Sequence, residues 1–301
     1  MKPAFPKILD STMIASFRSC PYKFSLEYLH HWKPRVNSVH LHAGGAYAKG
    51  LEKAREAFYV HGKPEDEAKA IGLGALITTY GDFECPPDSA KSLERMCDAF
   101  EYYFDQYPLA NDAAKPIALP SGDRGIEFSF AEPIEAVNPE TGDPILYVGR
   151  MDMIVDYAQG TFGLDDKTTS SLGASWSKQW DLRSQFTGYC WGAAQAGIPL
   201  QGFLVRGVSI LKHTCGTQQA LTYRPKWMID RWYEQLLRDV ARMKVMWESG
   251  VWDYNLDHSC VEYSGCVFRQ PCLSADPQPW LEGSFTRRVW NPLTRQEEGA
   301  E

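Results

Sequence analysis

The order of β-type and helical segments between residues 126 and 211 constrains the fold more than any other feature. Two segments, Ile126 to Phe130 and Ile145 to Asp156, favour strands. The loop between them, from Asn138 to Pro144, is rich in turn residues, so we predict a hairpin. A third strand, a helix and a last strand follow over residues 162–167, 182–195 and 203–211. Strands interleaved with a helix in this way predict an α/β core, in which helices pack on a sheet.

The segments on either side of this core are mainly helical. A helix capped by Asp10 and Ser11 opens the chain, and Pro225 and Gly250 mark the start and end of a long helix near the other terminus. Two further helices are expected over residues 46–60 and 90–107. We therefore expect one domain over residues 1–301, with three parts: a helical part, an α/β core, and a helix followed by a cysteine-rich segment, over residues 1–110, 111–215 and 216–301.

The bulk composition describes an ordinary globular protein rather than a nucleic-acid coat protein. The formal net charge is −7, whereas a coat protein has an overall basic field. The start of the chain, Met1 to Pro6, lacks the apolar core of a secretory signal, and no stretch approaches the ~20 apolar residues that span a bilayer. These features predict a cytoplasmic protein without a membrane segment, in which clustered cysteines bind metal rather than form disulfides.

A carboxylate and a lysine stand two residues apart in the expected strand of residues 162–167. Because side chains alternate along a strand, Asp165 and Lys167 point to one face and Asp166 points to the other. With a second carboxylate from a neighbouring strand, such a pair can hold Mg²⁺ or Mn²⁺ and activate a water molecule. The alternative is a surface salt bridge, which is the common role of an isolated Asp-Asp-Lys sequence.

The helix that follows carries a polar pair on one face. Gln185 and Tyr189 are four residues apart, so an amide and a phenol align along the helix. They could reach a phosphate or a metal-bound water. The alternative is a partly buried polar pair with a structural role.

Three of the eight cysteines are closely spaced near the C-terminus. Cys260, Cys266 and Cys272 have the spacing C-x5-C-x5-C in a loop-rich segment, and Cys20 is the candidate for a fourth ligand. Four thiolates suit an iron–sulfur cluster or zinc. Zinc is the alternative metal, but the paired C-x2-C knuckles that usually bind it are absent from the sequence, so a 4Fe–4S cluster is favoured. The alternative role is that of small buried hydrophobic residues.

Three motifs occur in an order that resembles a known family. The runs G-R-M-D-M-I-V-D, L-D-D-K-T-T and Q-F-T-G-Y are similar to motifs of the PD-(D/E)XK nuclease superfamily, in particular its RecB-like branch of CRISPR-associated and phage-encoded exonucleases. The resemblance implies a restriction-endonuclease-like central mixed sheet flanked by helices. It assigns Asp152 and Asp165 as metal ligands, Lys167 as the catalytic lysine, and Gln185 and Tyr189 as assisting residues.

The resemblance also covers a helical glutamate near residue 50 and the cysteines near the two ends of the chain. Glu52 matches a helical glutamate of the family and is assigned as a third acidic metal ligand, although Ala48 stands where many relatives carry a histidine. The same branch binds a 4Fe–4S cluster through one N-terminal cysteine and three C-terminal ones. Relatives often have two residues between the first pair of C-terminal cysteines, whereas this chain has five.

The resulting hypothesis is a metal-dependent DNA nuclease that uses Mg²⁺ or Mn²⁺. The resemblance favours an exonuclease in DNA end processing, recombination or phage replication, and leaves the oligomeric state open. One alternative is a weak or inactive DNA-end-binding protein, because the histidine is missing at Ala48. Another, motivated by the acidic net charge, is a zinc- or cluster-containing interaction module without a nucleic-acid role. Six basic residues are candidates for phosphate contacts: Arg18, Lys23, Arg150, Lys178, Arg183 and Arg206.

Overall fold

A computed structural model gives the structure of residues 2–36, 38–261 and 265–299. Residues 262–264 of the expected cysteine-rich segment therefore lie outside the described residues.

The chain divides into two compact units, each built from separate segments. Unit 1 contains Met1–Val36, Phe130–Gly149 and Trp227–Glu301, and unit 2 contains Asn37–Ser129 and Arg150–Lys226.

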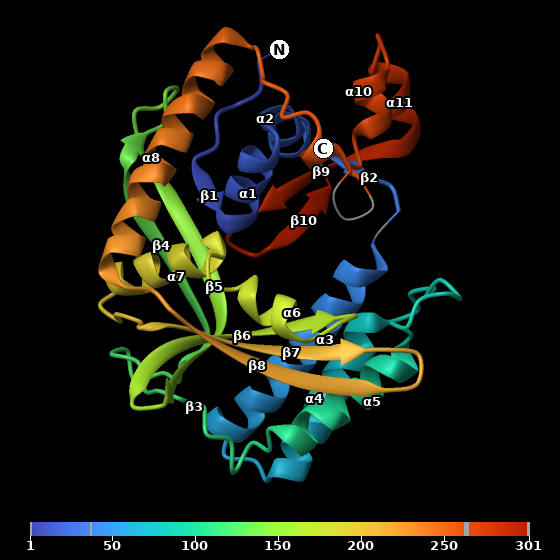
Figure 1. The fold of residues 1–301 in the computed structure, drawn as a ribbon, viewed down its shortest axis with the longest axis vertical. Coiled ribbons are helices and arrows are strands. Elements are labelled where there is room, and N and C mark those ends of the chain that lie inside the picture. The colour runs from blue at the N-terminus through green and yellow to red at the C-terminus, as the bar shows by residue number, and fades with distance from the viewer. Residues whose placement is uncertain (1, 37, 262–264, 300–301) are drawn as a thin grey trace. The chain divides into compact units, whose positions relative to one another are not determined.

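A mixed sheet is the largest feature of the fold, as the sequence predicts (Figure 1). Its strand order is β1-β5-β6-β7-β8, and β3 and β4 also pair with β5. Strands β6 and β7 are parallel, whereas β5–β6 and β7–β8 are antiparallel. The strands are β1 (Ile8–Asp10), β3 (Lys115–Pro116), β4 (Ile126–Val137), β5 (Pro144–Tyr157), β6 (Gly160–Thr169), β7 (Gly202–Ile210) and β8 (Cys215–Tyr223). The predicted hairpin corresponds to β4 and β5.

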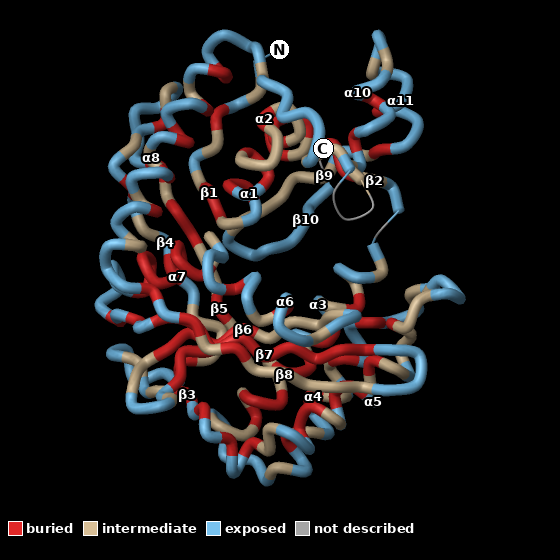
Figure 2. Tube along the Cα trace, in the orientation of Figure 1, coloured by how far each residue is buried: buried red, intermediate tan, exposed pale blue. Residues whose placement is uncertain are grey.

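In unit 2, helices pack on both faces of β6 and β7. Helices α3, α4 and α5 lie together on one face, and α6 and α7 belong to the other (Figure 1). The helices are α3 (Val39–Arg55), which continues as the π-helical turn η2 (Glu56–Val60), α4 (Glu65–Tyr80), α5 (Leu93–Gln106), α6 (Ala174–Lys178) and α7 (Ser184–Gln195). This arrangement buries β7 completely, as the tube drawing shows (Figure 2).

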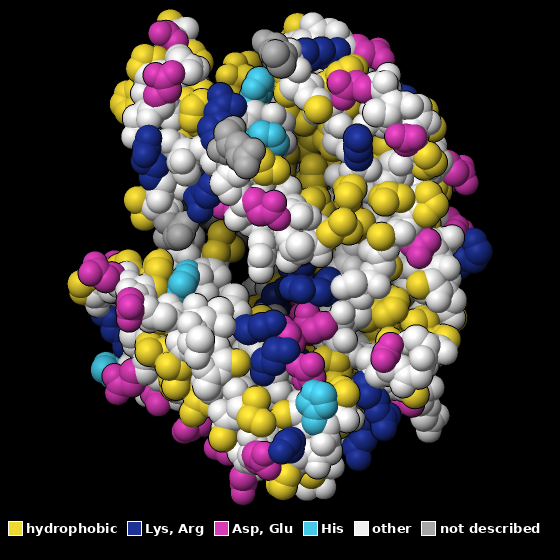
Figure 3. Space-filling model, turned by 180° about the vertical axis from the view of Figure 1, so that it is seen from behind, with side chains coloured by type: hydrophobic (Ala, Val, Ile, Leu, Met, Phe, Trp, Pro, Cys, Tyr) yellow, Lys and Arg dark blue, Asp and Glu magenta, His cyan; other side chains and the backbone are white. Residues whose placement is uncertain are grey.

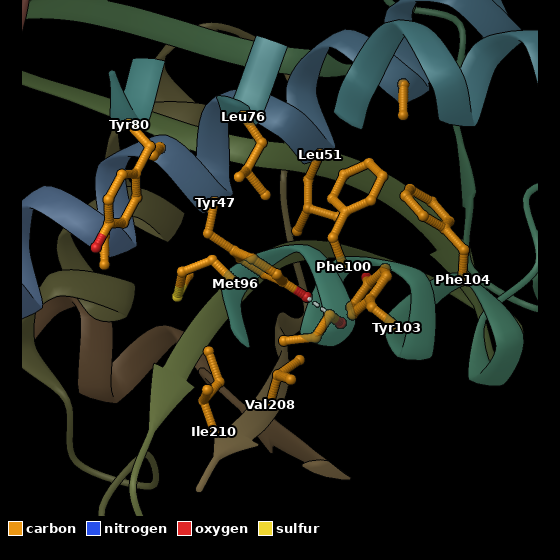
Figure 4. Close-up of a cluster of buried hydrophobic side chains, with 14 of the residues drawn as sticks. Tyr47, Leu51, Leu76, Tyr80, Met96, Phe100, Tyr103, Phe104, Val208 and Ile210 are labelled. Carbon is orange, nitrogen blue, oxygen red and sulfur yellow. Dashed lines mark hydrogen bonds between the residues drawn. The ribbon is translucent and has the colours of Figure 1, made fainter. Parts of the chain in front are cut away.

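Alternation along β7 decides which helices each side chain meets. Val208 and Ile210 join the apolar cluster of α3, α4 and α5, whose centre contains Tyr47, Leu76 and Phe100 (Figure 4). Phe203 faces the opposite way and stacks on Phe186 of α7, with ring centroids 4.5 Å apart. Both faces of the sheet are therefore packed, which accounts for the continuous apolar composition of this strand.

Unit 1 contains the N-terminal helices and the C-terminal segment. Asp10 caps α1 by accepting a hydrogen bond from the Met13 N–H at 2.8 Å, as the sequence predicts. The chain is extended at Cys20, before Pro21 opens a new helix. The remaining elements are α1 (Ser11–Ser19), α2 (Pro21–Phe24), η1 (Ser25–Leu29), α8 (Lys226–Ser249), α9 (His258–Val261), α10 (Arg269–Leu273), α11 (Gln278–Ser284), and the strands β2 (Trp32–Pro34), β9 (Phe285–Asn291) and β10 (Gln296–Gly299).

Over the described part of the chain, every helix is too short or too polar to cross a lipid bilayer.

Candidate active site

The Asp165–Lys167 pair lies on the face of β6 that α7 covers. The parallel register sets Asp165 beside Val205 and Lys167 beside Gly207, on the same side of the sheet as Phe203. The two side chains form an ion pair. The Asp165 side chain is 6% exposed and that of Lys167 is 31% exposed, so the ammonium keeps access to solvent while the carboxylate is buried.

Asp152 joins this pair from the neighbouring strand. The antiparallel register of β5 and β6 pairs Met153 with Leu164, so the next position sets Asp152 beside Asp165. The backbone N–H of Asp166 donates a hydrogen bond to Asp152 Oδ2 at 2.8 Å. The structure thus brings together the two aspartates and the lysine that the sequence singles out.

Several carboxylates surround a single lysine in this site, and their charges shift the pKa values of the group. Burial raises the pKa of Asp152 to about 8, and the neighbouring carboxylates of Asp165 and Glu127 contribute in the same direction. Burial works to lower the pKa of Lys167, but Asp165 and Asp152 outweigh it and raise the pKa above its ordinary value. Lys167 therefore stays charged at neutral pH.

Gln185 and Tyr189 form the polar pair that their spacing predicts. Gln185 Nε2 donates a hydrogen bond to the Tyr189 hydroxyl at 3.0 Å, on the first two turns of α7. The Tyr189 ring also lies 6.0 Å from the ring of Phe203, so the phenol is on the lysine's side of the sheet. The pair therefore borders the Asp165–Lys167 face.

Glu52 lies on α3, which packs on the face of the sheet opposite to the one that carries Asp165 and Lys167. It accepts hydrogen bonds from Lys49 Nζ at 2.6 and 2.8 Å and forms an ion pair with Lys53 at 3.3 Å. Its ion pairs thus run to lysines of its own helix. Glu52 and Glu127 line the same cavity, and Glu127 is one of the residues whose charges affect the pKa of Asp152.

Glu127 is a residue of this site that the sequence does not reveal. The Ile154 N–H donates to Gly125 O at 2.7 Å, so antiparallel pairing sets Glu127 opposite the region of Asp152. Its carboxylate forms an ion pair with Arg150 at 3.0 Å. Its φ of 51° is unusual for a residue other than glycine. The presence of a glutamate at this position gives no indication of such a backbone conformation.

The four cysteines predicted as cluster ligands lie near one another in unit 1. Burial raises the pKa of Cys272 to about 11, and the negative charges of Cys266, Cys20 and Cys260 contribute in the same direction. The Cys266 N–H donates to Cys260 O at 3.0 Å. Taken over the described residues, no group of three or more His, Cys, Asp or Glu side chains is arranged to hold a metal ion.

The expected phosphate contacts need one clear correction. Arg206 is 1% exposed and is unavailable to a phosphate. Its guanidinium binds both carboxylate oxygens of Asp112 at 2.6 Å. Arg150 is paired with Glu127, and Arg18 is paired with Asp239 at 2.7 Å. On the face drawn in Figure 3, acidic and basic side chains are interspersed among the described residues.

Comparisons with known proteins test the family resemblance that these motifs indicate. The family model described as "PD-(D/E)XK nuclease superfamily" matches residues 11–273. A search of curated proteins found no match. Among solved structures, a candidate exonuclease from Eubacterium rectale is 14% identical at a TM-score of 0.50, covering 85% of this chain and 88% of that one. At this identity the likeness shows a shared fold alone.

A second solved structure, that of SSO0001, is also 14% identical, over 64% of this chain and 73% of that one. Its TM-score is 0.28.

Proposed function

The chain belongs to the PD-(D/E)XK nuclease superfamily, and on that premise we propose that it is a metal-dependent nuclease that hydrolyses phosphodiester bonds in DNA. The mixed α/β architecture, with a central sheet flanked by helices, is consistent with the restriction-endonuclease-like fold of that superfamily. The observation that carries the proposal is the group formed by Asp152, Asp165 and Lys167 on adjacent strands.

The chemistry of this group fits a hard divalent cation. Two carboxylates meet beside a single ammonium, and Glu127 adds further negative charge, so a cation would stabilise the ionised form of Asp152, whose pKa is raised by burial and then by these neighbouring carboxylates. Carboxylate oxygens are the ligands that Mg²⁺ and Mn²⁺ prefer. We propose Asp152, Asp165 and Glu52 as the ligand set. When bound, the metal would lower the pKa of a coordinated water and neutralise phosphate charge.

Each remaining side chain has a separate task in the proposed reaction. Lys167 keeps its charge, so its ammonium can orient the attacking water or stabilise negative charge on the phosphate. Asp165 holds that ammonium in place. The hydrogen bond from Gln185 fixes the orientation of the Tyr189 phenol, which supports the lysine from α7.

We further propose that residues 1–301 act as one nuclease domain that carries a 4Fe–4S cluster on Cys20, Cys260, Cys266 and Cys272. Their placement supports this, because all four lie in unit 1 and the charges of Cys20, Cys260 and Cys266 all reach Cys272. The cluster would act as a staple between segments about 240 residues apart in sequence, and long-loop cross-links restrict the unfolded chain. Zinc remains the alternative occupant.

We also propose, more specifically, that the protein acts as an exonuclease. This proposal is supported by the RecB-like order of the motifs. The test uses anaerobically purified protein with end-labelled linear DNA and closed circular DNA, in Mg²⁺, Mn²⁺ or EDTA. Lys167→Ala is the test variant, and Lys212→Ala, an exposed lysine on the β7–β8 loop, is its control.

We expect metal-dependent loss of linear DNA in the wild type and in Lys212→Ala, and none in Lys167→Ala. Survival of circular DNA would indicate attack at ends. The rival hypothesis is an inactive protein that binds DNA ends, motivated by Ala48. It predicts no cleavage in either metal, together with salt-sensitive binding to DNA ends in EDTA.

A further inference from the structure

A cavity of about 470 Å³ opens beside the candidate active site in unit 2. It lies between α3 with its η2 turn and the segment that leads into β4. Its lining residues are Glu52, Glu56, Tyr59, Val60, Gly122, Asp123, Arg124, Ile126 and Glu127. Pockets of about 300–1,000 Å³ are typical of small-molecule sites, so this one has room for a single nucleotide.

The cavity adjoins the proposed catalytic carboxylates. Glu52 is one of its walls and also a proposed metal ligand. Glu127 is another wall, and its charge is felt by Asp152. A group bound in the cavity would therefore lie next to the bond that the proposed nuclease cleaves.

Three of the four acidic residues in the lining are paired with neighbouring cations, and the fourth, Asp123, accepts a hydrogen bond from the Ser121 hydroxyl at 2.9 Å. Glu52 is paired with Lys49 at 2.6 Å, and Glu127 is paired with Arg150 at 3.0 Å. Glu56 is paired with Lys53. Phosphate is repelled much less by carboxylates that are already paired than by isolated ones.

Arg124 is the cation that is left to bind an anion. It is exposed, it lines the cavity, and among the residues that the structure describes it has no ion-pair partner. The tight turn before it, with Gly122 at a φ of 93°, carries Arg124 to the cavity. A guanidinium with uncommitted donors is the preferred side chain for binding phosphate through two parallel hydrogen bonds.

The remaining walls suit a nucleobase. The ring of Tyr59 is held by the hydrogen bond from its hydroxyl to Leu109 O at 2.8 Å, so it is an anchored aromatic surface. Val60 and Ile126 add apolar surface. Bases stack on aromatic side chains with little regard to sequence, as a nuclease that degrades arbitrary DNA requires.

We propose that this cavity binds the terminal nucleotide of a DNA strand, with its phosphate on Arg124 and its base against Tyr59. The proposal rests on the nuclease function proposed above, and it assigns the substrate end to one side of the catalytic carboxylates. It also gives the chain a physical reason to prefer strand ends, since a terminal nucleotide can enter a cavity that a continuous duplex would bypass.

The first test measures nucleotide binding without catalysis. Deoxyadenosine 5′-monophosphate is titrated into Lys167→Ala protein in EDTA, and binding is followed by calorimetry. The same titration is made with Arg124→Ala added, and with Lys212→Ala added as the matched control for loss of one exposed cation. Deoxyadenosine and inorganic phosphate are titrated separately to divide the contributions of base and phosphate.

We expect saturable binding of the nucleotide, weakened about tenfold or more by Arg124→Ala and unchanged by Lys212→Ala. Each fragment should bind more weakly than the whole nucleotide. No saturable binding, equal binding to Arg124→Ala, or phosphate alone binding as tightly as the nucleotide would each overturn the proposal. An active nuclease without nucleotide binding refutes only the cavity, and a nucleotide-binding protein without nuclease activity refutes only the proposed function.

A second test uses strand ends directly. If the wild type cleaves linear DNA, Arg124→Ala should raise KM for DNA with a terminal phosphate several-fold, while kcat changes little. Arg124→Lys should recover part of the loss, because it keeps the charge without the paired hydrogen bonds. A fall in kcat at unchanged KM would contradict a binding role.

Discussion

Arg55 and Asp166 form an ion pair at 2.7 Å between Nη1 and Oδ2, and both side chains are at least 96% buried. Tyr103 completes the group: its hydroxyl accepts a hydrogen bond from Arg55 Nη2 at 2.7 Å and donates to Asp166 Oδ1 at 2.8 Å. A buried ion pair of this kind survives only when its remaining polar atoms are also satisfied.

This pair connects two parts of the candidate active site. Arg55 lies one turn after Glu52 on α3, whereas Asp166 stands between Asp165 and Lys167 on β6. The Asp166 N–H also donates to Asp152 at 2.8 Å. The ion pair therefore fixes the helix that carries Glu52 against the strand that carries the proposed catalytic lysine.

We predict that stability and activity respond differently to removal of the Arg55–Asp166 pair. Asp166→Ala leaves Arg55 buried without its counter-charge and should cost about 3–5 kcal/mol of unfolding free energy. The double variant Arg55→Met/Asp166→Leu buries no charge and should recover most of that loss. Its nuclease activity should stay at least about tenfold low, because α3 is no longer held in register by a directional contact. Denaturant unfolding and cleavage rates measure the two effects.

One outcome would contradict a role of this pair in activity. If the double variant recovers both stability and cleavage, the pair contributes only to folding. Arg238→Met/Glu234→Leu is the matched control, since it removes an exposed ion pair at 3.6 Å on α8 and should change stability by less than about 1 kcal/mol.

The part of the site that the sequence predicts is the part that depends on local geometry. Alternation along a strand is enough to put Asp165 and Lys167 on one face, and helical spacing is enough to align Gln185 with Tyr189. Local patterns do not identify Glu127 as a site residue, because its position depends on the pairing of β4 with β5 and on a positive φ. Local patterns also do not predict the buried ion pair of Arg206, because its partner, Asp112, lies 94 residues away in sequence.

The sequence does not reveal helix α4, for a different reason. Its buried face consists of Ala68, Gly72, Leu76 and Tyr80, so half of the stripe is made of residues too small to signal a core. A search for large apolar residues at helical spacing does not detect such a face. The close approach of α3 and α4 explains the small residues, but that approach is a property of the tertiary structure.

Asp152 should make the metal-free protein less stable as pH rises. Its pKa is raised from 3.8 to about 8, first by burial and then by Asp165 and Glu127. Between those two values the carboxyl loses its proton only in the unfolded chain, so stability falls as pH rises through this window. Asp152→Asn cannot ionise. In EDTA its melting temperature should therefore exceed that of the wild type by a margin that grows from about pH 4 to about pH 8.

Thermal unfolding in EDTA over a pH series measures that margin. Asp156→Asn, an exposed aspartate on the same strand, serves as the control and should show no such trend. A margin for Asp152→Asn that is equal at both ends of the window would refute the raised pKa.

The cysteine proposal predicts linked changes in colour and stability. Cys266→Ser should remove the iron and the visible absorbance of anaerobically purified protein, and should lower the melting temperature by at least about 5 °C. Cys85→Ser, outside the proposed ligand set, should change neither. Metal analysis decides the occupant: iron with sulfide supports the cluster, whereas one zinc in a colourless protein supports the alternative. Retention of full colour and melting temperature by Cys266→Ser would refute ligation by this thiol.

The contact between α3 and α4 gives the last prediction, because it depends on glycine. A Cβ at Gly72 would lie 2.6 Å from Gly50 O and 2.7 Å from Ala54 Cβ, so Gly72→Ala must push the helices apart. We expect a loss of about 1–3 kcal/mol in denaturant unfolding. Gly74→Ala, on the same helix with nothing within 4 Å, should instead gain up to about 1 kcal/mol. Since α3 carries Glu52, Gly72→Ala should also slow cleavage while Gly74→Ala leaves it unchanged, and equal behaviour of the two variants would contradict the close packing.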